Sequence, residues 1–185
     1  GSNEQDLFQF ADVLPADCYI ISPRAPLVLG SDRFGWYHVD FSSGKPVINS
    51  REELDARLVI LSLIDQLYEH FQLDELFLGG FSQGAIMSYT VGLLNADRVT
   101  GIIALSGRLL EEIKPMIPQD HSLQSLPVFI AHGISDNTLP VAYAREAKAY
   151  LSALGMDISY HEYPTGHTIS NELIKDLTGW LDSRK

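Results

Sequence analysis

A short apolar run of strand type passes directly into an apolar run of helix length through residues 80–84, Gly-Phe-Ser-Gln-Gly. The strand-type run is Glu75–Gly79, and the helix is predicted over Gln83–Asn95. A turn this tight leaves no room for a Cβ atom at either glycine, and we expect Ser82 to be strained with its hydroxyl exposed. Backbone N–H groups at the helix start would face an anion formed at Ser82. G-x-S-x-G in this setting is typical of the nucleophile elbow of serine hydrolases, and the competing interpretation is a turn without chemistry.

Strand-type runs alternate with helical patterns along the whole chain. The predicted strands are Cys18–Ser22, Glu75–Gly79, Val99–Leu105, Pro127–His132 and Ile158–Tyr163. The predicted helices are Asn3–Leu14, Arg51–Phe71, Gln83–Asn95, Val141–Leu154 and Ile169–Ser183. Such alternation indicates crossover units and a parallel sheet. The chain has 185 residues, and we therefore expect a single α/β domain over residues 1–185, with a mostly parallel sheet flanked by helices on both faces.

Two of these helices carry further signals at their ends. The run Ser50–Glu53 matches a capping box, and Pro140 and Gly155 stand just before and just after the Val141–Leu154 helix. The interval Pro23–Ser50 is predicted to be surface loop. After the capping box, apolar side chains recur at helical spacing at Leu54, Leu58, Leu61, Ile64, Leu67 and Phe71.

Charge and cysteine content narrow the classes of partner. The net charge is −11 and the pI is near 4.8, which argues against nucleic acid and anionic membrane surfaces as partners. The single cysteine, Cys18, allows no intrachain disulfide, and we expect a buried strand thiol. No apolar run approaches the length of a membrane span, and no signal peptide is evident, so a cytoplasmic location is the default expectation, with a removed leader as the alternative.

A serine nucleophile needs a base, which along the chain of a sheet hydrolase follows both the serine and the acid. His167 fits this order: it follows the strand ending at Tyr163 across a short turn, opens the last helix, and has beside it Gly166, which would let the backbone approach closely. We therefore expect His167 to be the base. The other histidines precede the serine, lie in a polar loop, or lie in strands where packing is the favoured interpretation: His38, His70, His121, His132 and His161.

Asp136 is the best candidate for the acid that orients the base. It follows the predicted strand Pro127–His132, in a loop at the carboxyl end of that strand. The competing interpretation is an aspartate that caps a turn or helix. The other acidic residues between Ser82 and His167 lie in helix ends, surface turns or the start of a strand: Asp97, Glu111, Glu112, Asp120 and Asp157.

These motifs, in this order and spacing, resemble the α/β-hydrolase superfamily, and most of all the phospholipase/carboxylesterase group that includes acyl-protein thioesterases. The stretches that carry the resemblance span nearly the whole chain: 20–26, Arg33 to Trp36, 80–85, His132-Gly133 with Asp136 and Pro140, and Gly166-His167. The resemblance implies a compact esterase or thioesterase with little lid and no cofactor. It also implies an acyl-enzyme mechanism with Ser82 as nucleophile and the backbone N–H of Gln83 as one oxyanion donor.

The same resemblance implies a second oxyanion donor, supplied by a His-Gly-x-Gly type loop after a central strand. The chain begins at Gly1-Ser2-Asn3, which looks like the tail of that loop. We therefore expect the natural protein to have residues upstream of Gly1 that carry this strand and loop. The alternative is that Gly1-Ser2 remains from an expression tag on a fragment.

The acyl-binding pocket is predicted from loops at the same sheet edge. We expect Arg33, Phe34, Trp36 and Leu139 to contact the substrate, in the company of Tyr37 and residues 108–117, and packing under the loop is the competing interpretation for the aromatic residues. No metal-ligand spacing or phosphate-binding loop is present in the sequence. The favoured function is hydrolysis of short or medium acyl esters. The alternatives are a thioesterase or amidase on the same triad and a non-catalytic binding protein on this fold.

Overall fold

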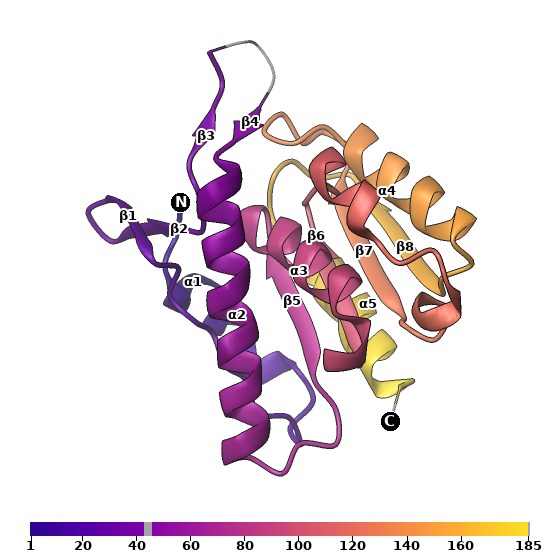
Figure 1. The fold of residues 1–185 in the computed structure, drawn as a ribbon. Helices are drawn as coiled ribbons and strands as arrows, with labels where there is room; N and C mark the ends of the chain where they lie inside the picture. The colour runs from indigo at the N-terminus through magenta and orange to yellow at the C-terminus, as the bar shows by residue number, and fades with distance from the viewer. Residues whose placement is uncertain (43–45, 185) are drawn as a thin grey trace. The chain divides into compact units, whose positions relative to one another are not determined.

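The computed structural model describes residues 1–42 and 46–184. They form two compact units, Gly1–Phe71 and Gln72–Lys185, and each unit is described by itself (Figure 1). Within the described residues, no helix combines the length and the apolar character needed to cross a bilayer.

The second unit is built on a four-stranded parallel sheet, and the predicted parallel sheet is confirmed here. The strands lie side by side in chain order, β5-β6-β7-β8. Helices α3 and α4 lie on one face of the sheet and α5 lies on the other (Figure 1). The strand bounds are Phe77–Phe81 for β5, Gly101–Leu105 for β6, Val128–Gly133 for β7 and Ile158–Tyr163 for β8. The helix bounds are Gln83–Leu94 for α3, Ala142–Ala153 for α4 and Asn171–Asp182 for α5, with 3-10 turns at Ala96–Arg98, Glu111–Met116 and His121–Leu123.

Helices on both faces explain why the two central strands are apolar without alternation. Every residue of β6 and β7 is buried, as expected for a parallel sheet covered on both sides. Phe129 of β7 has no exposed surface, and its ring centroid lies 5.5 Å from that of Trp180 on α5. Because truncating a buried phenylalanine costs about 3–5 kcal/mol, contacts of this kind hold α5 onto the sheet.

The carboxyl ends of these strands are aligned, which fixes the edge from which the loops emerge. The residue after each of the first three strands donates its N–H to the neighbouring strand. These bonds run from Ser82 to Leu105 O (2.9 Å), from Ser106 to Ala131 O (2.8 Å) and from Ile134 to Tyr163 O (2.8 Å). The loops that follow β5, β7 and β8 therefore leave the sheet at one edge, where ligands bind in open α/β sheets.

The first unit consists of short elements and one long helix. The prediction of a loop over Pro23–Ser50 is wrong, because two small antiparallel hairpins form there. The turn of the first hairpin uses Asp32 with φ 52°, a left-handed conformation that aspartate adopts more readily than most residues. The bounds are Glu4–Phe8 for α1, Ala11–Val13 for a 3-10 turn, Leu27–Gly30 for β1, Arg33–Gly35 for β2, Val39–Asp40 for β3, Val47–Ile48 for β4 and Ser50–His70 for α2.

Two predictions for the first unit fail because the stretches lack tertiary support. Cys18–Ser22 does not form a strand, because it is in no sheet ladder of the described residues, and Cys18 is exposed rather than buried. The helix predicted over Asn3–Leu14 is wrong beyond Phe8. None of the five residues of α1 is buried, and a short helix without packing is marginal.

Helix α2 begins one residue before its predicted start, and its cap and its buried face both differ from the prediction. Its cap is Asn49, whose side chain accepts hydrogen bonds from the backbone N–H groups of Arg51 and Glu52, so the predicted capping box at Ser50 is wrong. Of the six apolar residues noted at helical spacing, Ile64 alone is buried. The buried face also contains Ile60, together with a charged and a small residue that a search for large apolar side chains passes over, Glu53 and Ala56.

Candidate active site

Ser82 occupies a strained turn between β5 and α3, as the sequence predicts. Its backbone has φ 56° and ψ −117°, and the residue is half-buried. A Cβ atom on Gly80 would lie 2.4 Å from the carbonyl carbon of Gly84, so the glycine requirement is confirmed at that position. It is wrong at Gly84, where a Cβ atom would meet no described atom within 4 Å beyond its chain neighbours and the backbone of its own helix. The close approach therefore depends on the first glycine of the motif.

His167 contacts the Ser82 hydroxyl. Its Nε2 lies 3.0 Å from Ser82 Oγ, and its ring packs against Phe81, with 4.6 Å between ring centroids. The residue follows β8 as predicted. It does not open the last helix, because α5 begins at Asn171 with Ser170 as its cap. The imidazole therefore stands in a loop of its own, held between a strand-end aromatic ring and the serine.

Asp136 contacts the other nitrogen of the same ring. Its Oδ2 lies 2.7 Å from His167 Nδ1, and its Oδ1 accepts the backbone N–H groups of Thr138 and Leu139 at 2.8 Å each. The carboxylate is fully buried. Burial by itself raises the pKa of Asp136, but the hydrogen bonds from His167 and from the two N–H groups outweigh it and hold the pKa below its ordinary value. Asp136 therefore stays ionised. The turn-capping contacts of the competing interpretation are also present, because the same carboxylate closes its own loop.

The loops that carry the acid and the base are joined through their backbones. Ile134 N–H donates to Tyr163 O, and Ser135 N–H donates to Thr165 O at 2.9 Å. A Cβ atom on Gly133 would lie 2.2 Å from Gly166 O. The close approach expected at Gly166 thus exists, but Gly133 is the residue that permits it. Because of these contacts, the position of Asp136 fixes the position of His167.

This geometry defines the proton positions. A carboxylate only accepts hydrogen bonds, so the 2.7 Å contact places the proton of neutral His167 on Nδ1. Nε2 then carries a lone pair and accepts the Ser82 hydroxyl proton. Ser82 is therefore arranged as a nucleophile beside a base whose tautomer a buried carboxylate determines, which is the arrangement used for acyl transfer.

One residue of this cluster was not identified from the sequence. His132, expected to be a packed strand histidine, is buried with no exposed surface, and its Nε2 lies 3.3 Å from Asp136 Oδ2. The signal that could have found it is its place at the end of β7, four residues before the acid. His161, assigned the same packing role, stacks on Phe129 at 5.0 Å between ring centroids.

The remaining predicted site residues divide between the two units. Gln83 is the first residue of α3, and Leu139 is half-buried in the acid loop. Arg33 and Phe34 lie in β2 of the first unit, followed by Trp36 after the strand, so their part in substrate binding stays a prediction. Half of residues 108–117 are buried in the second unit.

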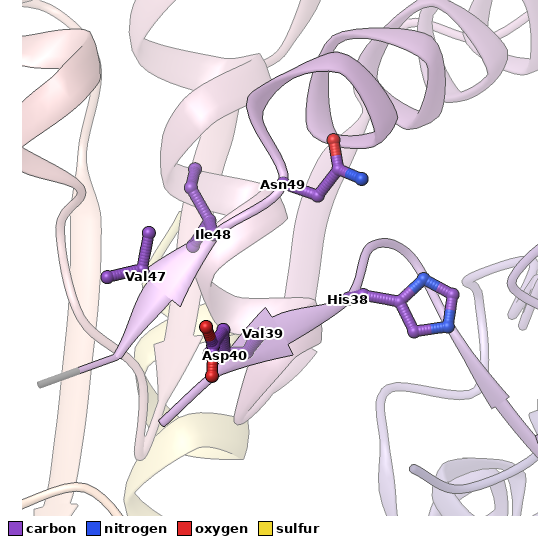
Figure 2. A pocket seen from close by; sticks show the side chains of 6 residues that line it. All are labelled: His38, Val39, Asp40, Val47, Ile48 and Asn49. Carbon is purple, nitrogen blue, oxygen red and sulfur yellow. The ribbon is translucent and has the colours of Figure 1, made fainter. Parts of the chain in front are cut away.

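A separate pocket lies within the first unit. It measures about 270 Å³ and lies at the β3–β4 hairpin, where Figure 2 shows its lining residues, His38, Val39, Asp40, Val47, Ile48 and Asn49. None of these belongs to the Ser82 cluster. Among the described residues, no group of three or more His, Cys, Asp and Glu side chains is placed to hold a metal ion.

Comparison with known proteins gives consistent matches over almost the entire chain. The family model for phospholipase/carboxylesterase matches residues 8–184. Acyl-protein thioesterase 1 of Emericella nidulans is 30% identical over 179 residues, which are 88% of this chain and 75% of the relative. The crystal structure of the Bacillus cereus carboxylesterase has a TM-score of 0.83 at 19% identity and covers 100% of this chain and 84% of its own. For acyl-protein thioesterase 2 of Zea mays the TM-score is 0.81 at 20% identity, with 100% and 89% covered.

Proposed function

Because the chain belongs to the phospholipase/carboxylesterase family and is therefore a hydrolase of the serine esterase type, we propose that Ser82, His167 and Asp136 form its catalytic triad. We further propose that it cleaves carboxylic esters of short or medium acyl chains. The observation that carries the proposal is the pair of contacts at His167, 3.0 Å to the serine hydroxyl and 2.7 Å to the buried carboxylate.

The proposed reaction proceeds through an acyl-enzyme. Ser82 Oγ attacks the acyl carbonyl carbon while His167 Nε2 takes the hydroxyl proton, and Asp136 stabilises the imidazolium that forms. His167 then gives this proton to the leaving alcohol oxygen as the ester bond breaks. In the second half, His167 takes a proton from water, whose oxygen attacks the acyl carbon. The acid is released, and the proton returns to Ser82.

The tetrahedral intermediates carry a negative oxygen that needs fixed donors. We assign the first donor to the backbone N–H of Gln83, which supports an oxyanion beside Ser82 because it is the first residue of α3. The positive end of the helix dipole at this terminus favours the same charge. Loss of one oxyanion donor typically costs about 10²–10³ in rate, so we expect the Gln83 N–H to contribute a factor of this size to kcat.

Leu139 is proposed to contact the acyl group, because its backbone N–H binds the catalytic carboxylate and its side chain is half-buried in the same loop. Substrate contacts by Arg33, Phe34 and Trp36 rest on the sequence. Kinetics of Trp36→Ala over a series of nitrophenyl esters of rising chain length test them. A ratio of variant KM to wild-type KM that increases with acyl chain length supports acyl recognition by Trp36. A ratio that stays the same at every chain length contradicts it.

Thioester hydrolysis is the second candidate, favoured by the relatives that bear the name acyl-protein thioesterase. The same triad could hydrolyse esters, thioesters and amides, because each of these reactions begins with attack on an acyl carbon. Parallel measurement of kcat/KM on nitrophenyl esters and on acyl thioesters of matched chain length ranks the two.

A fluorophosphonate probe tests the activated serine itself. The probe reacts with a serine hydroxyl only when a base has activated it, so the expected result is labelling of wild type at Ser82, located by peptide mass. Absence of both labelling and ester or thioester turnover in the folded protein would overturn the proposed function.

A further inference from the structure

His132 is a buried polar side chain at the base of the acid loop. It is the fifth residue of β7, and 0% of its surface is exposed. Its Nε2 lies 2.7 Å from Leu139 O and 3.3 Å from Asp136 Oδ2. One imidazole nitrogen thus faces both the acid and the far end of the loop that carries it.

The Leu139 carbonyl determines the tautomer of this ring. A carbonyl oxygen only accepts, so Nε2 of His132 carries a proton and donates it. Nδ1 is buried and has no hydrogen-bonding partner among the residues that the structure describes. Nε2 is therefore the nitrogen through which this ring donates.

Two carboxylates lie near His132, and each has other donors. Asp136 accepts from His167 and from two backbone N–H groups, so its charge is already met by other donors. Glu162 lies across from His132 in the register of β7 and β8, and it is paired with Arg145 of α4 through two contacts of 2.7 Å.

We propose that His132 is a positioning residue for the acid of the triad, an inference that rests on the proposed function. Its Nε2–H donates to Leu139 O and lies beside Asp136 Oδ2, 3.3 Å from Nε2, while the N–H of Leu139 donates to Asp136 Oδ1. The peptide at Leu139 is therefore tied both to the carboxylate and to the imidazole that packs beside it. By holding the Leu139 carbonyl and packing beside the carboxylate, His132 restrains Asp136 in the place where it meets His167. Misplacement of a catalytic group by about 1 Å can cost about 10²-fold in rate, so such a restraint has a measurable effect.

The test uses variants matched in volume and differing in the donor. His132→Gln places an amide N–H near the position of Nε2, and His132→Leu fills similar space without any donor. His161→Gln is the control, because this strand histidine of β8 stacks on Phe129 and bonds to Ser159 Oγ. Each variant is assayed for kcat and KM on a nitrophenyl ester, for the rate of fluorophosphonate labelling, and for Tm.

We expect His132→Leu to lower kcat and the labelling rate by about 10- to 100-fold, with KM within about twofold of wild type. His132→Gln should recover most of that loss, and His161→Gln should match wild type. A folded His132→Leu with wild-type kcat, or a folded His132→Gln as slow as His132→Leu, would overturn the proposal. A wild-type protein that neither labels nor turns over substrate would instead defeat the proposed function.

Nitrogen NMR of wild type gives a test that does not depend on the variants folding. The expected spectrum of His132 shows a ring that carries a proton on Nε2, as the contact with Leu139 O requires. A ring protonated at Nδ1 alone would contradict the hydrogen bond to Leu139 O.

Discussion

Asp136 Oδ2 and His167 Nδ1 lie 2.7 Å apart, although 31 residues separate them in the chain. The contact exists because β7 and β8 are parallel neighbours whose carboxyl ends coincide, and because the two following loops are hydrogen-bonded to each other. The carboxylate is buried and accepts from His167 Nδ1, which leaves Nε2 facing the Ser82 hydroxyl. The two loops and the carboxyl ends of the strands therefore hold the proposed acid and base together.

Removal of the nucleophile should abolish turnover without affecting the fold. We expect Ser82→Ala to lower kcat on a nitrophenyl ester by roughly 10⁴–10⁶, because no other group can form the acyl-enzyme. Ser88→Ala is the control, since Ser88 is buried in the same helix and its hydroxyl bonds to Gly84 O. It should keep most of the activity. Full turnover by Ser82→Ala would defeat the mechanism.

Asp136→Asn should preserve the loop but move the proton of the His167 ring from Nδ1 to Nε2. An asparagine Oδ1 can still accept the two backbone N–H groups, while its Nδ2 would face His167 Nδ1 as a donor. His167 would then present a protonated Nε2 to Ser82 and could not accept its proton. We expect kcat to fall by about 10⁴ with KM little changed. Steady-state kinetics decide this, and a variant within tenfold of wild type would show that the carboxylate is not needed.

The lowered pKa of Asp136 predicts how stability depends on pH. A carboxyl group whose folded pKa lies below its unfolded value adds stability above the unfolded value, and this stability is lost as pH falls through the folded pKa. The ordinary value is about 3.9, so the loss should occur below about pH 4. The measurement is urea unfolding of wild type and Asp136→Asn between about pH 6 and pH 2.5.

The difference in unfolding free energy between these two proteins should be constant near neutral pH and should shrink below about pH 4. Asp97→Asn, a change at an exposed position in a 3-10 turn, serves as control. If the wild-type and Asp136→Asn curves stay parallel through the whole range, the hydrogen bonds to Asp136 do not favour its charged form in the folded state.

Much of the second unit could be predicted from the sequence because its signals are local. The strand Ile158–Tyr163 is confirmed at both ends, and β7 and α4 differ from their predicted bounds by one residue at each end. The strand β5 extends two residues further than predicted, through Gly80 and Phe81, because these residues pair with Ala104 and Leu105 of β6. The carboxyl end of β5 is therefore set by pairing with β6, and the side-chain pattern of β5 alone does not reveal it.

The failures share a non-local cause. Cys18–Ser22 has the composition of a strand, but a strand forms only where another backbone accepts its hydrogen bonds. His132 appeared to be a packed strand residue because the sequence does not show that its ring reaches Leu139 O. The three residues of the candidate triad could be identified from the sequence, because their order along the chain follows the order expected for a parallel-sheet hydrolase.

Gly133→Ala should disturb both loops of the site at once. A Cβ atom at this position would lie 2.2 Å from Gly166 O and 2.5 Å from Thr165 O, and both are backbone atoms that cannot rotate away. The base loop must therefore shift from the acid loop, which separates His167 from Asp136. We expect a destabilisation of about 1–3 kcal/mol and a loss of kcat of about 10²-fold.

Gly179→Ala in α5 is the matched control. A Cβ atom there meets no described atom within 4 Å beyond its chain neighbours and the backbone of its own helix, and alanine favours a helix over glycine by up to about 1 kcal/mol. Thermal unfolding and ester kinetics of both variants test this, and a Gly133→Ala protein as stable and active as wild type would show that the two loops are not held in contact.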